Sequence, residues 1–115
     1  MTNWDYARVS WLDHEARLTC TDPAFVDQAL AGLGTLYPKS LVDQRQDPAD
    51  KTINLRLGGL EGRGHIAGRW LLEQLGHQGW KLFQVDARPS KRNTRTLFLT
   101  YNQSGYYHFR RESGS

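Results

Sequence analysis

The chain has few cysteines and no long apolar segment, and both absences restrict what it can be. Cys20 is the single cysteine of 115 residues, so an internal disulfide is excluded and a reducing, cytoplasmic setting is the simplest expectation. Cys20 ends a stretch with alternating apolar residues, which favours a buried, unreactive thiol. No apolar run is long enough to span a bilayer, and residues 1–5 are polar, so we expect neither a membrane segment nor a signal peptide.

Composition and charge indicate a small globular domain with an uneven charge distribution. The hydrophobic fraction is 38% and the charged fraction 23%, which predicts one folded domain over residues 1–112 and a disordered tail at 113–115. The formal net charge is +3, yet seven of the 15 Lys and Arg and only two of the 12 acids lie from Lys81 onward. A basic C-terminal third indicates an anionic partner, an acidic protein surface or solubility alone.

The first third of the chain predicts a β-hairpin followed by a helix. Residues 5–11 and 16–21 alternate apolar and polar side chains on either side of a polar turn. Thr21-Asp22-Pro23 then combines capping residues with a proline, which is typical of a helix start. Apolar residues at helical spacing follow, and Gly34 is the expected end of this helix.

The middle of the chain predicts a loop, a strand, a helix and another strand. Segment 39–51 is the most polar stretch; a strand could begin at Leu41 and Val42, and the rest is expected to be an exposed loop. Residues 53–57 alternate cleanly, which favours a strand of an antiparallel sheet with one buried face. A helix is expected over 65–75 and a strand over 80–85. The apolar face of this helix is expected to consist of Ile66, Ala67, Trp70, Leu71 and Leu75.

The C-terminal part predicts a second hairpin and completes the fold. Residues 96–101 and 106–110 are expected to pair across a loop at 102–105, after a basic turn at 88–93. The resulting order of elements predicts an α+β fold, in which two helices pack on one face of an antiparallel sheet of about five strands.

A glycine-rich segment before the second helix is the first candidate site. Gly62-Arg63-Gly64-His65-Ile66-Ala67 fits the G-x-G-x-x-A fingerprint of dinucleotide-binding folds, follows a strand and opens a helix. We disfavour that fold, because polar residues interrupt the preceding strand and the chain has no room for a second half. A weaker hypothesis stays open, in which free N–H groups at the helix start hold a phosphate or carboxylate. The candidate anion-binding residues are Arg63, Gly64, His65 and Arg69.

The basic, aromatic hairpin is the second candidate site. Cations beside aromatic strands are typical of single-strand nucleic-acid binders, in which charge follows the backbone and rings stack on bases. No RNP-type signature accompanies them, so we prefer a contact surface for a protein and keep nucleic-acid binding as the alternative. The candidate partner-binding residues are Arg88, Lys91, Arg92, Arg95, Tyr101, Tyr106 and Tyr107.

Motifs for catalysis and metal binding are lacking. The four histidines are scattered without metal-ligand spacing, and neither a nucleophile elbow nor a base close to Cys20 is present. We therefore expect no cofactor, no metal and no catalytic residue. Among the four tryptophans, Trp70 and Trp80 are expected in the core, whereas Trp4 and Trp11 are expected to be partly exposed contact residues.

Three fragments carry a resemblance to a known family. They are Trp4-Asp5-Tyr6, the central Leu75-Gly76-His77-Gln78-Gly79-Trp80-Lys81-Leu82, and Tyr106-Tyr107-His108-Phe109-Arg110-Arg111. Together they resemble a small bacterial family, domain of unknown function 4177, whose short members lack most of the segment between Trp11 and Ile66. The resemblance implies a compact helix-on-sheet domain and no established catalytic residues. Within the central fragment, Gly76 is expected to take a left-handed helix cap and Gly79 to turn the chain.

These observations leave three functional hypotheses. The first is a small non-enzymatic binding or regulatory module that acts through protein–protein contacts, including self-association as a homodimer through an exposed strand. The second is a single-stranded nucleic-acid-binding protein that uses the basic hairpin, and the third is an enzyme or sensor that binds a phosphate-bearing ligand at residues 58–64. A steep salt dependence of binding would favour the second over the first.

Overall fold

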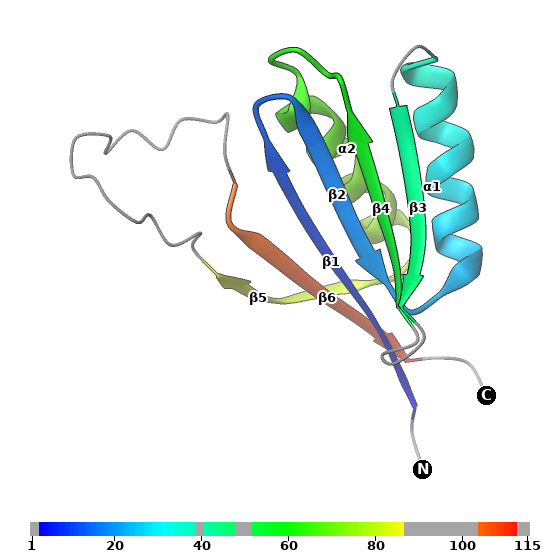
Figure 1. Cartoon of the computed structure of the whole chain (residues 1–115). Helices are drawn as coiled ribbons and strands as arrows, with labels where there is room; N and C mark the ends of the chain where they lie inside the picture. Colours follow the sequence, from blue (N-terminus) through cyan, green and yellow to red (C-terminus); the bar gives the residue numbers. More distant parts are fainter. Residues whose placement is uncertain (1–2, 39–40, 48–51, 87–103, 113–115) are drawn as a thin grey trace.

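A computed structural model of the chain describes residues 3–38, 41–47, 52–86 and 104–112. One antiparallel sheet of six strands and two helices make up the described part, which confirms the predicted α+β class (Figure 1). The strands are β1 (Trp4–Leu12), β2 (Glu15–Cys20), β3 (Leu41–Asp47), β4 (Thr52–Gly58), β5 (Lys81–Asp86) and β6 (Tyr106–Glu112), in the spatial order β3-β4-β2-β1-β6-β5. The helices are α1 (Pro23–Leu36) and α2 (Gly64–His77).

Both helices pack on the same face of the sheet, as expected. Helix α2 lies against β1 and β2, and α1 lies beside it against β2 and β4. Figure 1 looks onto the other face, which neither helix covers. Within the described residues, no helix has the length and apolarity needed to cross a membrane.

Strand β3 (Leu41–Asp47) confirms the strand start considered at Leu41 and Val42 and corrects the exposed loop expected at 43–47; residues 39–40 and 48–51 lie outside the described part. It pairs with β4 along its full length, from Leu41 opposite Gly58 to Asp47 opposite Thr52. The segment is polar because it forms an edge of the sheet, where backbone pairing on one side suffices and charged residues discourage further strand addition. An edge strand therefore lacks the apolar alternation that reveals a half-buried strand.

Strand β6 corrects the predicted C-terminal hairpin. It lies between β1 and β5, with Val9 opposite Tyr107 on one side and Asp86 opposite Tyr106 on the other. Both edges of β6 are therefore paired, one with β1 and the other with β5. The strand predicted at residues 96–101 lies outside the described part of the chain. Ser104, expected in a loop, continues along β1, where its Oγ accepts from the Trp11 N–H at 2.8 Å.

The helix ends also differ from the prediction at both glycines. Helix α1 continues through Gly34, which is exposed, and ends at Leu36 before Pro38. At the end of α2, Gly79 rather than Gly76 takes the left-handed conformation, with φ of 85°. The N–H of Trp80 donates to the Leu75 carbonyl at 3.0 Å, and that of Gly79 to the Gly76 carbonyl at 3.2 Å, which together form a Schellman cap.

The core lies between the helices and the covered face of the sheet. Cys20 is fully buried, which confirms its predicted burial, and burial raises the pKa of its thiol to about 12. Trp80 is buried as expected and Trp4 is exposed as expected. Trp11, however, is buried, which corrects its prediction as a contact residue, because α2 lies directly over it.

Helix α2 approaches the β1–β2 hairpin more closely than an alanine would permit. A Cβ atom at Gly64 would lie 1.8 Å from the Leu12 carbonyl oxygen, and one at Gly68 would lie 2.1 Å from the Trp11 ring. The Gly64 N–H donates to the Asp13 carbonyl at 3.0 Å. This approach rotates Ile66 outward, so that it is exposed rather than part of the apolar face.

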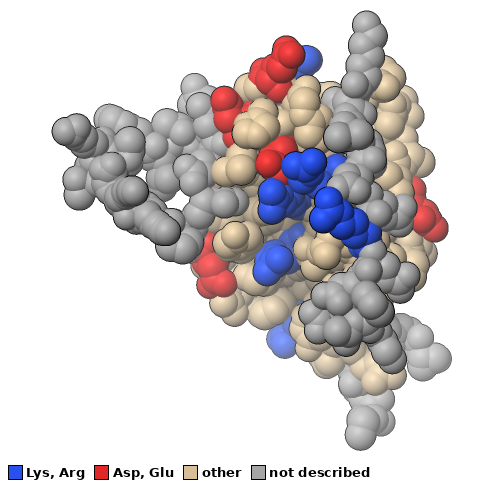
Figure 2. Space-filling view, in the orientation of Figure 1, with Lys and Arg blue, Asp and Glu red and all other residues tan. Residues whose placement is uncertain are grey.

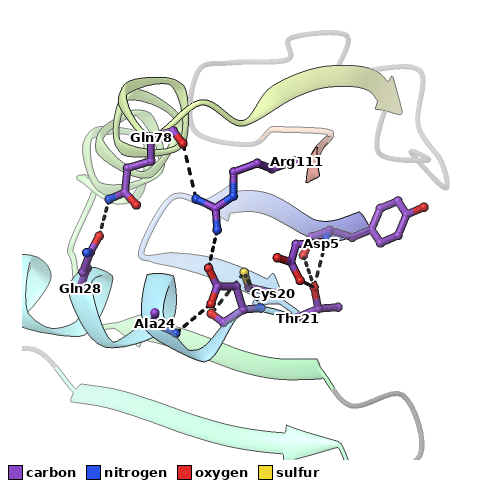
Figure 3. A network of polar contacts seen from close by, with 9 residues as sticks. Asp5, Cys20, Thr21, Ala24, Gln28, Gln78 and Arg111 are labelled. Carbon is purple, nitrogen blue, oxygen red and sulfur yellow. Dashed lines mark hydrogen bonds and ion pairs between the residues drawn. The ribbon is translucent and has the colours of Figure 1, made fainter. Parts of the chain in front are cut away.

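Arg111 ties the end of β6 to both helices (Figure 3). Its Nη2 donates to Asp22 Oδ2 at 2.6 Å, and its Nη1 donates to the Gln78 carbonyl at 3.4 Å. Asp22 also caps α1 by accepting from the Ala24 N–H at 3.0 Å. The side-chain amides of Gln78 and Gln28 join the two helices beside this contact. One arginine thus connects the start of α1, the end of α2 and the sheet.

Candidate functional site

Four neighbouring strands each place an arginine on the uncovered face of the sheet. They are Arg8 on β1, Arg17 on β2, Arg45 on β3 and Arg56 on β4. Residues directly opposite one another in adjacent strands share a face, and the register aligns Arg8 with Thr19, Asn54 and then Arg45. In Figure 2 the basic side chains gather over the middle of the sheet.

These arginines line a hollow in the surface. The hollow has a volume of about 490 Å³, and Ser10, Thr19, Asn54 and Tyr106 contribute to its walls. A second hollow of about 360 Å³ shares Arg8, Thr19 and Asn54 with the first. We call the two together the sheet groove. Its side chains are Arg8, Arg17, Arg45, Arg56, Ser10, Thr19, Asn54 and Tyr106, with Tyr6, Phe83 and His108 at the far end.

The register forces two positive charges together in the groove. Arg17 lies directly opposite Arg56, an arrangement that destabilises an antiparallel pair of strands. Arg17 donates from Nε to Glu15 Oε2 at 2.6 Å, whereas Arg56 has no ion-pair partner among the described side chains. Asp43 is the residue opposite Arg56 on β3. A local conflict of this kind is typical of a site selected for binding rather than for stability.

Glu15 offsets one of these charges. Burial of its side chain raises the pKa of the carboxyl group, but the hydrogen bond and charge of Arg17, followed by the charges of Arg56 and His14, outweigh burial and leave the pKa below its usual value. Glu15 is therefore ionised at neutral pH and held by Arg17. The other arginines lie on the same face of the sheet and line the groove.

Aromatic rings accompany the arginines along the groove. The Arg8 guanidinium lies 5.1 Å from the centre of the Tyr106 ring. At the far end, Tyr6 and Phe83 meet edge to face with their ring centres 6.4 Å apart, and Arg110 lies 5.2 Å from the Phe83 ring. Phe83 occupies the irregularity between Leu82 and Gln84 of β5. An irregularity of this kind redirects a side chain, and Phe83 accordingly contacts residues of the uncovered face.

His108 and Asp86 form a second polar pair at this end. Asp86 Oδ2 lies 2.9 Å from His108 Nε2, and Asp86 Oδ1 accepts from the Gln84 amide at 2.8 Å. The hydrogen bond from Gln84, followed by that from His108, lowers the pKa of Asp86. Across the described side chains, no group of three or more His, Cys, Asp or Glu residues is arranged to hold a metal ion.

The structure describes only two of the seven residues of the predicted partner-binding site. Arg88, Lys91, Arg92, Arg95 and Tyr101 lie outside the described residues. Tyr106 lies in the sheet groove. Tyr107 lies on the covered face, stacked on Trp11 with ring centres 5.4 Å apart, because neighbouring residues of a strand point to opposite faces.

The residues of the predicted anion site lie at the start of α2. Arg63 and Arg69 are exposed, Gly64 is buried and His65 is half-buried. The Gly64 N–H, one of the groups expected to bind an anion, donates to the Asp13 carbonyl. Gly64 thus has a packing role, and an anion at this helix start stays a prediction.

The distribution of charge along the sequence did not predict the arginines of the sheet groove. All four precede residue 81, in the part of the sequence that carries more acids than bases. The pattern that indicates them is the alternation within each strand, because an arginine between two apolar residues points away from the buried face. Arg8 lies between Ala7 and Val9, and Arg56 lies between Leu55 and Leu57. Recognising that these positions share one face requires the order of the strands.

No family model, curated protein or solved structure matches the chain. The resemblance to domain of unknown function 4177 therefore stays a prediction, and the function has to be argued from the sheet groove itself.

Proposed function

We propose that the protein is a non-enzymatic binding module that holds an anionic partner in the sheet groove. One observation carries the proposal: four adjacent strands each direct an arginine into one hollow on the uncovered face. Arginine presents several N–H donors in a planar fork that fits phosphate and carboxylate oxygens, and it stays charged at every physiological pH.

The other groups of the groove suit binding rather than chemistry. Thr19 donates from Oγ1 to Asn54 Oδ1 at 2.8 Å, so the amide N–H groups of Asn54 are the neutral donors that this pair offers between the arginines. Two of the carboxylates beside the groove are engaged: Glu15 by Arg17, and Asp86 by His108 and Gln84. Their low pKa values keep them ionised, which is unsuited to general acid catalysis near pH 7.

The proposal is tested with an anionic chain that has no bases. A fluorescent abasic oligodeoxynucleotide of about 12 residues would be titrated with protein at about 50 and 200 mM salt. We expect binding that weakens with salt and falls at least about tenfold in Arg56→Glu, because a hydrogen bond to a charged group contributes about 1.5–3 kcal/mol.

Arg69→Glu and Arg63→Glu are the matched controls. They make the same change of charge at exposed positions of the helix layer, so they separate the groove from net charge. Affinity unchanged in both controls but reduced in Arg56→Glu supports the groove. An equal loss in all three variants would show that only net charge matters, and a loss confined to Arg63→Glu and Arg69→Glu would move the site to the start of α2.

Strand β5 favours self-association as a second candidate function. In the described part of the chain β5 forms one edge of the sheet, and on the side away from the groove Leu82 and Val85 are 50% and 53% exposed. An apolar edge strand presents unpaired backbone groups to a second copy. Sedimentation over a range of concentrations is expected to show a dimer that Val85→Lys converts to monomer. A monomer at every concentration would exclude this candidate.

A further inference from the structure

We infer that the anionic partner is a single-stranded nucleic acid, with phosphates at the arginines of the sheet groove and bases against its exposed rings. This inference rests on the function proposed above and adds the class of partner.

The rings at the far end of the groove carry the inference. Tyr6 is 48% exposed and Phe83 43% exposed, although both belong to strands of a sheet whose other face is well packed. His108 lies beside Phe83, with ring centres 6.2 Å apart. Exposed rings on a sheet surface are the usual platform on which unpaired bases stack.

Each ring platform also has an arginine next to it. Arg8 lies over Tyr106, and Arg110 lies between Trp4 and Phe83, at 4.8 Å and 5.2 Å from the two ring centres. A nucleotide presents a flat apolar base and a charged phosphate on one unit. A ring with a neighbouring guanidinium matches both parts, and the guanidinium plane itself can stack on a base.

The sheet groove has the extended form that a single strand of nucleic acid requires. Its two hollows join at Arg8, Thr19 and Asn54 and run along the strands from Ser10 to Tyr6, about 14 Å at a rise of about 3.4 Å per residue. The arginines are concentrated at the Ser10 end and the exposed rings at the Tyr6 end. A single phosphate ion would use the first end and leave the second uncovered.

The same features favour a single strand over other polyanions. A duplex stacks its bases inside and presents only backbone and groove edges, so it cannot cover the rings. An acidic peptide would pair with the arginines, but it carries no regular series of flat apolar groups. The combination of charge and exposed rings therefore distinguishes an unpaired strand.

The test compares three probes of equal length on the unaltered protein. An oligo-dT of about 12 nucleotides, the abasic chain of the same length and a duplex would be titrated by fluorescence anisotropy at about 50 mM salt. We expect oligo-dT to bind tighter than the abasic chain by about tenfold or more, and tighter than the duplex. The abasic chain reports the proposed function, and the difference between the two chains reports stacking.

The Phe83→Leu variant tests whether the difference in affinity between oligo-dT and the abasic chain arises at the sheet groove. It keeps an apolar side chain and removes the ring, so it is expected to reduce the affinity for oligo-dT by a larger factor than the affinity for the abasic chain. Leu36→Ala is the control, since it removes an exposed apolar side chain at the end of α1, in the helix layer away from the groove. Circular dichroism would confirm that both variants are folded.

Each alternative result overturns a different statement. Equal affinity for oligo-dT and the abasic chain would overturn stacking and leave an anion-binding groove. Duplex binding as tight as oligo-dT would overturn the single strand, and an oligo-glutamate that binds as tightly as oligo-dT would instead indicate an acidic protein partner. Binding of no probe at low salt would overturn the proposed function together with this inference.

Discussion

The two faces of β1 show how differently the same strand is used on its two sides. Ala7, Val9 and Trp11 point to the helices and are buried, whereas Tyr6 and Arg8 point to the groove and retain contact with solvent. On the covered side, Gly64 and Gly68 allow α2 to approach β1 more closely than a residue with a Cβ atom would. On the uncovered side like charges stand opposite one another. Close packing is thus concentrated on one face, and the other face carries the groove that we propose as the binding site.

The largest loss of stability is expected from a substitution at the contact between α2 and the β1–β2 hairpin. Gly64→Ala would place a methyl group against the Leu12 carbonyl, which backbone atoms cannot avoid, and is expected to lower the free energy of unfolding by about 3 kcal/mol or more. Gly34→Ala is the control, because no described atom lies within 4 Å of the added methyl group, and it is expected to stabilise by about 0.5–1 kcal/mol. Urea unfolding measures both, and equal effects would contradict the close approach.

Substitution of two adjacent arginines of β6 compares the contributions of the two faces of the sheet to stability. Arg111→Ala breaks the contact with Asp22 and the Gln78 carbonyl on the helix side, and is expected to destabilise by about 2 kcal/mol. Arg110→Ala removes an exposed contact with Trp4 and Phe83 and is expected to cost about 0.5 kcal/mol. Chemical denaturation of both variants checks this difference. Similar losses would mean that the arginine near the groove is also structural.

The ion pair of Glu15 makes part of the stability dependent on pH. Its pKa is lowered in the folded protein, so its contribution is present above its unfolded value of about 4.3 and is lost as the pH falls through the folded value. Glu15→Gln is expected to be less stable by about 1 kcal/mol at pH 7, and the difference is expected to shrink as the pH falls below the unfolded value and to vanish below the lowered pKa of the folded protein. Urea unfolding over this range measures it, and a difference independent of pH would rule out the carboxylate as its source.

The smallest predicted effect on stability concerns the opposed arginines. Arg56→Thr removes the repulsion of Arg17 and places a good strand former on β4, so it is expected to stabilise the protein by about 0.2–1 kcal/mol. The same change is expected to weaken binding of the abasic oligonucleotide. Thermal unfolding and anisotropy on one preparation test both. A loss of stability would show that Arg56 has a structural role.

Local patterns predicted the elements that have a buried side or a clear start. The β1–β2 hairpin, the alternation of β4 and the start of α1 at Asp22 and Pro23 were all visible in the sequence. The end of α1 was not, since an exposed Gly34 is tolerated within a helix. Strand β3 was missed because an edge strand needs no apolar alternation, and the partner of β6 was misassigned because pairing between distant segments leaves no local signal.

The sequence by itself determined the class of fold, the two amphipathic helices and the alternating strands, because burial of one face imposes a period on nearby residues. Tertiary structure alone decided that β1, β2, β3 and β4 stand side by side with Arg8, Arg17, Arg45 and Arg56 on the same face. Strand order and register are set by contacts between residues far apart in the chain. The charge of a surface therefore follows from which strands are neighbours, and counting charges along the chain cannot supply it.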